Sequence, residues 1–222
     1  IIVLHWLITA IKSPSTLDLQ GPTYLGGFSL TLFVAVLTLL LSFPLGVLLA
    51  LGRTSSMPIA RVLCTVYIES VRGVPLITIL FFFSNILPLF LPAGMEIAEL
   101  AAIVTGYTLF SAAYLAENVR GGLQSVMRGQ YEAADAIGLT TSQRTGFIVI
   151  PQALRVSIPP LVGQAIGVFK ETSLVAIVGA FDILRIAAYV VPAQTEFLGV
   201  NREGLLRISV IYFAVAFSMS KY

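Results

Sequence analysis

The sequence predicts an all-α membrane protein with five transmembrane helices. Of its 222 residues, 57% are hydrophobic and only 11% are charged, and the mean hydropathy is +0.95. Soluble domains have roughly 45–50% apolar and about 25% charged residues. The apolar residues form long continuous runs, and a helix satisfies every backbone group in hydrocarbon within its own segment. Helical spans are therefore favoured over the alternating strands of a membrane barrel.

Intervals that are almost free of charge locate the spans, because a helix needs roughly 20 apolar residues to cross the hydrocarbon core. The predicted spans cover residues 25–51, 64–90, 100–116, 151–180 and 205 to the end. Pro75 lies inside the second span, where the loss of a backbone donor predicts a kink or hinge. Pro88 and Pro92 end that span. The whole chain is interpreted as a single transmembrane domain, residues 1–222.

Residues 1–12 are too few to cross a bilayer and too apolar for a free tail. We interpret them as the end of an additional N-terminal helix. A re-entrant or surface segment is the alternative. The segment lacks the basic region and the small-residue cleavage site of a secretory signal peptide.

Composition argues against several kinds of site. A single cysteine, Cys64, cannot form an internal disulfide, and a single histidine, His5, cannot build a histidine-rich metal or haem site. We therefore expect no catalytic residue, no metal and no cofactor in this chain. The net charge of +2 is not gathered in a basic block, so a nucleic-acid partner is not expected.

Lysines and arginines in short loops predict the orientation, since such loops are enriched in positive charge on the cytoplasmic side. The segment 84–99 has no positive charge and is predicted to be external. The segment 118–150 is then a cytoplasmic loop. Within it, EAADAIG predicts a short helix: Glu132 and Asp135 favour its first turns through the helix dipole, and Gly138 can adopt the left-handed conformation that ends it. Two alanines leave room for a partner to approach.

This loop resembles the EAA loop of ABC importer permeases. The matching residues are Glu132, Ala133, Ala134, Gly138, Ile150 and Pro151. Three further blocks are similar to polar amino acid uptake permeases: RGVPLITILFF at 72–82, AAYLAENVRGGLQSV at 112–126 and KETSLVAIVG at 170–179. The outer segment SNILPLFLPAGM looks most like the larger permeases of general L-amino acid systems. The resemblance covers residues 25–220 in four separate blocks.

The resemblance implies a five-helix ABC importer permease core in the bacterial plasma (inner) membrane, importing amino acids with broad specificity. It implies that Glu132, Ala133, Ala134 and Gly138 couple the permease to a cytoplasmic ATPase dimer, and that an external binding protein delivers the substrate. No lysine of the sequence follows the glycine of a Walker A loop, so ATP and Mg²⁺ belong to the partner ATPase and the chain is not an enzyme. Because five spans are few to enclose a pathway, we also expect a second permease subunit, identical or homologous.

Lys170 and Glu171 interrupt the fourth span. Each costs roughly 2.5–3.5 kcal/mol at the bilayer centre on insertion scales. Neighbours on a helix diverge by about 100°, so the two cannot neutralise each other, and one or both should face the bundle interior. A broken helix at KETS would let Thr172 and Ser173 satisfy freed backbone groups beside a cavity.

An amino acid substrate needs a partner for its ammonium and for its carboxylate when it leaves water. We predict that Glu171 accepts the ammonium, with Thr172 and Ser173 as hydroxyl partners, and that Arg72 meets the carboxylate. Two other interpretations stay open: an Arg72–Glu69 ion pair one turn apart, and a Lys170 that ties helix ends together or pairs with Glu117. Glu117 and Arg120 are interpreted as a paired cap.

Gly163 and Gly167 form a GxxxG motif, which lets helices approach closely in membranes. The motif indicates either contact with a neighbour beside the pathway or packing within the chain. An ion-coupled secondary amino acid carrier is the alternative function, because it also places a carboxylate in mid-membrane. An ion channel or a structural membrane subunit is a further rival.

Overall fold

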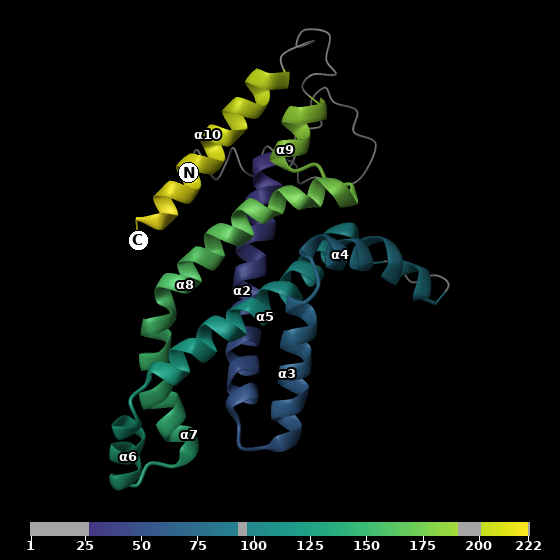
Figure 1. Ribbon diagram of the computed structural model, residues 1–222. Coiled ribbons are helices and arrows are strands. Elements are labelled where there is room, and N and C mark those ends of the chain that lie inside the picture. The colour runs from purple at the N-terminus through teal and green to yellow at the C-terminus, as the bar shows by residue number, and fades with distance from the viewer. Residues whose placement is uncertain (1–26, 93–96, 191–200, 222) are drawn as a thin grey trace.

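The computed structural model describes residues 27–92, 97–190 and 201–221, so the predicted N-terminal partial helix at 1–12 lies outside the described residues. Apart from one isolated bridge between Gly27 and Asp182, the regular structure described is helical, as predicted (Figure 1). In chain order the elements are α2 (Gly27–Thr54), α3 (Pro58–Arg72), α4 (Leu76–Phe81), the π-helix η1 (Phe82–Ile86), the 3-10 helix η2 (Leu87–Phe90), α5 (Glu99–Ser125), α6 (Arg128–Ala136), α7 (Thr141–Gln143), the π-helix η3 (Arg144–Val149), α8 (Ile150–Glu171), the 3-10 helix η4 (Thr172–Val178), α9 (Ile183–Arg185), the π-helix η5 (Ile186–Val190) and α10 (Asn201–Ser220).

Within the described ranges, 4 helical segments are long and apolar enough to cross a membrane: α2, α5, the run Thr141–Val178, and residues 202–220 of α10. A fifth crossing requires α3 and the segment Leu76–Phe90 together, and these two are bent by 100°. With that pair counted as one span, the five predicted spans are present. The bend lies where Pro75 precedes α4 in an extended conformation. The predicted kink is confirmed, and it is a break in the helix.

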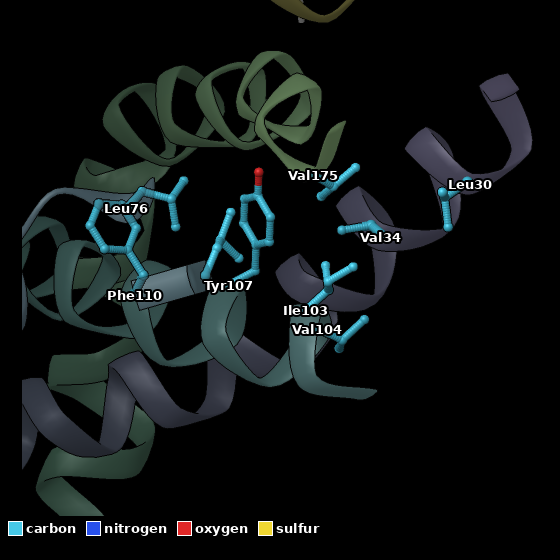
Figure 2. Close-up of a cluster of buried hydrophobic side chains, with 9 residues drawn as sticks. Leu30, Val34, Leu76, Ile103, Val104, Tyr107, Phe110 and Val175 are labelled. Carbon is cyan, nitrogen blue, oxygen red and sulfur yellow. The ribbon is translucent and has the colours of Figure 1, made fainter. Parts of the chain in front are cut away.

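Helix α5 is the central element of the bundle and packs against α2 on one side and α8 on another (Figure 1). Tyr107 on α5 is fully buried in a cluster that includes Val34 from α2, Leu76 from α4 and Val175 from η4 (Figure 2). Its hydroxyl donates a hydrogen bond to the backbone carbonyl of Glu171. Tyr107 is therefore a packing residue that also ties α5 to the end of α8.

At the opposite end of α5, the backbones of α5 and α8 nearly touch. A Cβ atom added to Gly122 would lie 2.2 Å from Ser157 Oγ and 2.3 Å from the carbonyl oxygen of Ala153. Only glycine fits at this crossing. Because α5 continues to Ser125, the predicted loop at 118–150 is wrong at its start, and the segment between the long helices is correspondingly shorter.

The connection between α5 and α8 contains the predicted short helix, α6. Gly138 follows it with φ +78°, so the predicted left-handed residue is confirmed. Because α6 already begins at Arg128, Glu132 lies in its second turn and Asp135 in its last, so the prediction that both lie in the early turns is wrong for Asp135. Thr140 and Gln143 then form a capping box that starts the next helical run, which continues through η3 into α8.

The predicted break at KETS appears as a change of helix type. The α-helix ends at Glu171 and continues as the 3-10 helix η4, which ends before Gly179 at φ +109°. Helix α10 lies beside α8, with many side chains of its described part exposed (Figure 1). None of its 18-residue apolar window is buried in this chain, whereas 67% of the α5 window is.

Candidate functional site

A cavity of about 330 Å³ opens between α5 and α8, on the side of the crossing away from α6. Its volume is in the range of small-molecule sites. The lining residues are Phe110, Ser111, Tyr114, Asn118, Pro160, Gln164, Gly167, Val168 and Glu171. We call this space the α5–α8 cavity.

Two amide side chains give the α5–α8 cavity a fixed polar wall. Asn118 Nδ2 donates to Gln164 Oε1 at 2.7 Å, and Gln164 Nε2 donates to the carbonyl oxygen of Ser111 at 2.8 Å. Gln164 is thus held at both ends of its amide. Sequence reasoning missed both amides, although each is an uncharged polar residue inside an apolar helix and therefore stands out from its neighbours.

Glu171 lies at the far end of the α5–α8 cavity and forms no ion pair with the described residues. Thr172 does not share that space: it is fully buried, and its hydroxyl donates to the carbonyl oxygen of Phe169 at 2.6 Å. Ser173 donates to the carbonyl oxygen of Lys170 at 2.9 Å. Both hydroxyls satisfy backbone groups where the helix changes type, as predicted.

Lys170 faces a different space from Glu171. It lines a cavity of about 670 Å³ between α8 and α10, together with Ser173, Tyr212 and Phe213. The prediction that neighbours at 170 and 171 point to different faces is confirmed. The structure therefore does not bring the predicted pathway residues together in one site.

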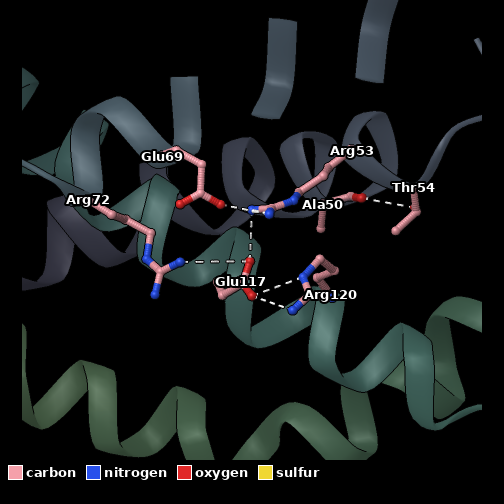
Figure 3. Close-up of polar contacts among 7 residues, drawn as sticks. All are labelled: Ala50, Arg53, Thr54, Glu69, Arg72, Glu117 and Arg120. Carbon is pink, nitrogen blue, oxygen red and sulfur yellow. Dashed lines mark hydrogen bonds and ion pairs between the residues drawn. The ribbon is translucent and has the colours of Figure 1, made fainter. Parts of the chain in front are cut away.

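Arg72 belongs to a cluster of charges centred on Glu117 of α5 (Figure 3). Glu117 Oε2 lies 3.1 Å from Arg53 Nη1 and 3.9 Å from Arg72 Nη1, and Oε1 accepts hydrogen bonds from Arg120. Arg53 also reaches Glu69 at 2.7 Å. We call these five residues the Glu117 cluster.

The contacts in the Glu117 cluster test three ion pairs that the sequence analysis considered. The predicted Glu117–Arg120 pair is confirmed. Glu69 pairs with Arg53, so the alternative Arg72–Glu69 pair is wrong; Glu117 pairs with arginines, so the alternative pair with Lys170 is also wrong. The Arg72 guanidinium lies 5.3 Å from the centroid of the Tyr114 ring, and that ring lines the α5–α8 cavity. Arg72 therefore stands behind one wall of the cavity.

The predicted coupling residues lie together on and just after α6. Ala134 is buried, while Ala133 and Gly138 are exposed. Glu132 is also exposed and pairs with Arg128 at 3.0 Å. The GxxxG face of α8 is open: a Cβ atom at Gly163 or Gly167 would meet none of the described atoms within 4 Å. Packing within the chain does not explain this motif in the described part of the protein.

Comparison with known proteins identifies the family. Residues 42–219 match the family described as "Binding-protein-dependent transport system inner membrane component". The chain belongs to this family. It is accordingly a multi-pass inner-membrane protein, and this membership disfavours the ion-coupled carrier and the channel.

Two curated relatives match most of this chain. A glutamate/glutamine/aspartate/asparagine transport system permease protein of Rhodobacter capsulatus is 45% identical over 99% of this chain and 52% of its own length. An inner membrane amino-acid ABC transporter permease protein of Escherichia coli is 47% identical over 89% of this chain and 53% of its own length. The chain spans about half the length of these relatives.

Solved structures agree with the fold. The crystal structure of an amino acid ABC transporter with histidines superposes with a TM-score of 0.76 at 32% identity, covering 88% of both chains. An inward-facing methionine ABC transporter superposes with a TM-score of 0.67 over 99% of this chain and 95% of its own. At 20% identity, the second match supports the fold alone.

Proposed function

We propose that this chain is the permease subunit of an ABC importer for polar amino acids. The observation that carries the proposal is the match to curated amino-acid permeases along almost the whole chain. The amide-lined α5–α8 cavity adds chemical support, because its volume and polar groups suit one small zwitterion. The relative from Rhodobacter capsulatus is named for glutamate, glutamine, aspartate and asparagine, which favours a broad range of acidic and amide substrates.

Glu171 is the proposed partner of the substrate ammonium, since it lines the cavity and forms no ion pair with the described residues. Asn118 and Gln164 offer hydrogen bonds to the carboxylate or to a side-chain amide. Arg72 becomes a carboxylate partner only when it moves past Tyr114 and away from Glu117. Thr172, Ser173 and Lys170 shape and flank the end of α8.

Partner proteins complete the proposed importer. A cytoplasmic ATPase dimer, which binds ATP and Mg²⁺, docks at Glu132 and Gly138 around α6. A second permease subunit covers the open faces of α8 and α10, and lipid surrounds the remainder. An external binding protein delivers the amino acid; closure of the ATPases then moves α6 and reopens the bundle toward the cytoplasm.

Uptake into vesicles that contain the purified complex tests this proposal. Native protein should accumulate glutamate, glutamine, aspartate and asparagine only when ATP is inside. Glu171→Gln should lower uptake by at least about tenfold, the effect of losing one charged partner worth about 1.4 kcal/mol. Glu99→Gln makes the same change at an exposed glutamate that begins α5, outside the cavity, and should leave uptake unchanged.

Unchanged uptake by Glu171→Gln for every amino acid would contradict the assigned site while leaving the importer function intact. Uptake by vesicles that lack an ATPase would contradict the importer and support the ion-coupled carrier.

A further inference from the structure

Helix α6 depends on contacts with the segment that follows it. The helix has 9 residues, of which only Ala134 is buried. A helix this short is unstable in water by itself. In the structure it lies beside η3 at one end of the bundle (Figure 1). Its orientation must therefore be set by side chains that join it to that element.

One ion pair makes this connection. Arg144 Nη1 lies 2.5 Å from Asp135 Oδ1 and 2.6 Å from Asp135 Oδ2. The Arg144 guanidinium also lies 5.6 Å from the centroid of the Tyr131 ring. Residues 131 and 135 occupy the same face of α6 on successive turns. Arg144 thus contacts that face at two levels; its side chain is 21% exposed, and that of Asp135 is 56% exposed.

Arg144 is itself anchored to the membrane helix. The chain turns at Gly138, and the Thr140–Gln143 capping box begins a new helical run. The Arg144 backbone N–H donates to the carbonyl oxygen of Thr140 at 2.8 Å. From Arg144 the run continues through η3 into α8 without a break. Asp135 is therefore bonded to the first residue of η3, within the helical run that leads into α8.

A second ion pair on α6 shows the contrast. Arg128 and Glu132 are one turn apart on the same helix, and their side chains are 92% and 65% exposed. That pair supports α6 locally and ties it to no other element. The Gln152–Gln130 hydrogen bond, at 3.0 Å, does join α8 to α6, but it is uncharged. Charge-assisted contacts are about twice as strong as neutral ones.

We propose that Asp135 and Arg144 are positioning residues that clamp α6 onto the η3–α8 run, so that motion of a docked ATPase moves α8. We call them the Asp135–Arg144 clamp. The inference rests on the proposed function, because it requires an ATPase at α6. Without the clamp, α6 keeps only uncharged contacts with this run, such as the Gln152–Gln130 hydrogen bond, and the ATPase cycles without moving the membrane helices to the same extent.

The test measures amino acid taken up per ATP hydrolysed, in vesicles that contain the complete importer. Arg144→Ala and Asp135→Ala should retain the ATPase on purification and hydrolyse ATP. Each should lower the transport-to-hydrolysis ratio by at least about fivefold, the lower end of typical coupling between two sites. The double variant Asp135→Arg with Arg144→Asp should recover most of the ratio, since it restores the pair in reverse.

Arg61→Ala is the matched control. Arg61 is an exposed arginine in the first turn of α3, and its guanidinium donates to the carbonyl oxygen of Ser55; its loss should leave the ratio unchanged. An unchanged ratio in Arg144→Ala, or a reversed pair no better than the single variants, would overturn the clamp. Loss of the ATPase from both single variants would overturn it in favour of a docking role. A native complex that carries no ATPase would instead overturn the proposed function.

Discussion

The two halves of the α5–α8 helix pair differ in how closely the helices pack and in whether their charged residues are paired. In the half near α6, Gly122 lies against Ala153 and Ser157, and the charge of Glu117 is matched by arginines. In the half near η4, the helices separate around the α5–α8 cavity, and Glu171 forms no ion pair with the described residues.

This difference separates a structural polar group from a functional one. A charge in an apolar helix is costly unless it is paired. Glu117 is paired within the chain, so its role is to hold helices together. Glu171 has no ion-pair partner among the described residues, which is why we propose it as a partner of the substrate. Substitutions should therefore reduce stability in the first half and transport in the second.

The largest effect on stability is expected for Glu117→Gln. The substitution keeps the size of the side chain but leaves Arg53, Arg72 and Arg120 around an uncharged amide. Breaking a buried ion pair costs about 3–5 kcal/mol, and the partial exposure of this cluster places the cost at the lower end of that range. Thermal unfolding of the purified protein in detergent measures it. Stability equal to that of the native protein would show that the arginines find other partners. It would contradict the structural role of Glu117.

A smaller loss is expected for Gly122→Ala. The new Cβ would overlap the Ala153 carbonyl oxygen, so the helices must move apart, at a cost of about 1–3 kcal/mol. The adjacent Gly121→Ala is the control, because its Cβ would meet none of the described atoms within 4 Å. Thermal unfolding of both variants in the same detergent measures the difference in their stability. Equal stability of the two would show that the crossing is not tight.

The smallest stability change is expected for Gln164→Leu, on the cavity side. The variant loses the hydrogen bonds with Asn118 and with the Ser111 carbonyl, at a cost of about 1 kcal/mol or less, since the freed groups face the cavity. Uptake of glutamine should nevertheless fall several-fold, because the polar wall is lost. Normal uptake with a large loss of stability would show that Gln164 has a structural role and not a role in transport.

The sequence predicted the spans well, because an apolar run of sufficient length is a local property. The conformations of Gly138 and of the chain at Pro75 were also predictable, since each depends on the backbone preferences of a few residues. The start of the 118–150 loop was predicted wrongly. The polar residues after residue 116 predict the end of a helix, although α5 continues through them to Ser125.

The pairing of charges between distant helices could not be predicted from the sequence, unlike the local Glu117–Arg120 pair. Arg53 and Glu117 are 64 positions apart, and only packing of α2 against α5 brings them together. Local spacing favoured Arg72 with Glu69 instead. The cavity has the same origin: Asn118 and Gln164 stand out individually as polar residues, but their contact depends on the crossing of two distant helices.

The Glu117 cluster also has a consequence for how the protein is made. Ribosomes extend chains from the N-terminus, so α2 and α3 leave the ribosome before α5. Arg53 can then pair with Glu69, but the carboxylate that Arg72 approaches has yet to be synthesised. The charges of the α2–α3 hairpin are therefore only partly neutralised until α5 has been synthesised.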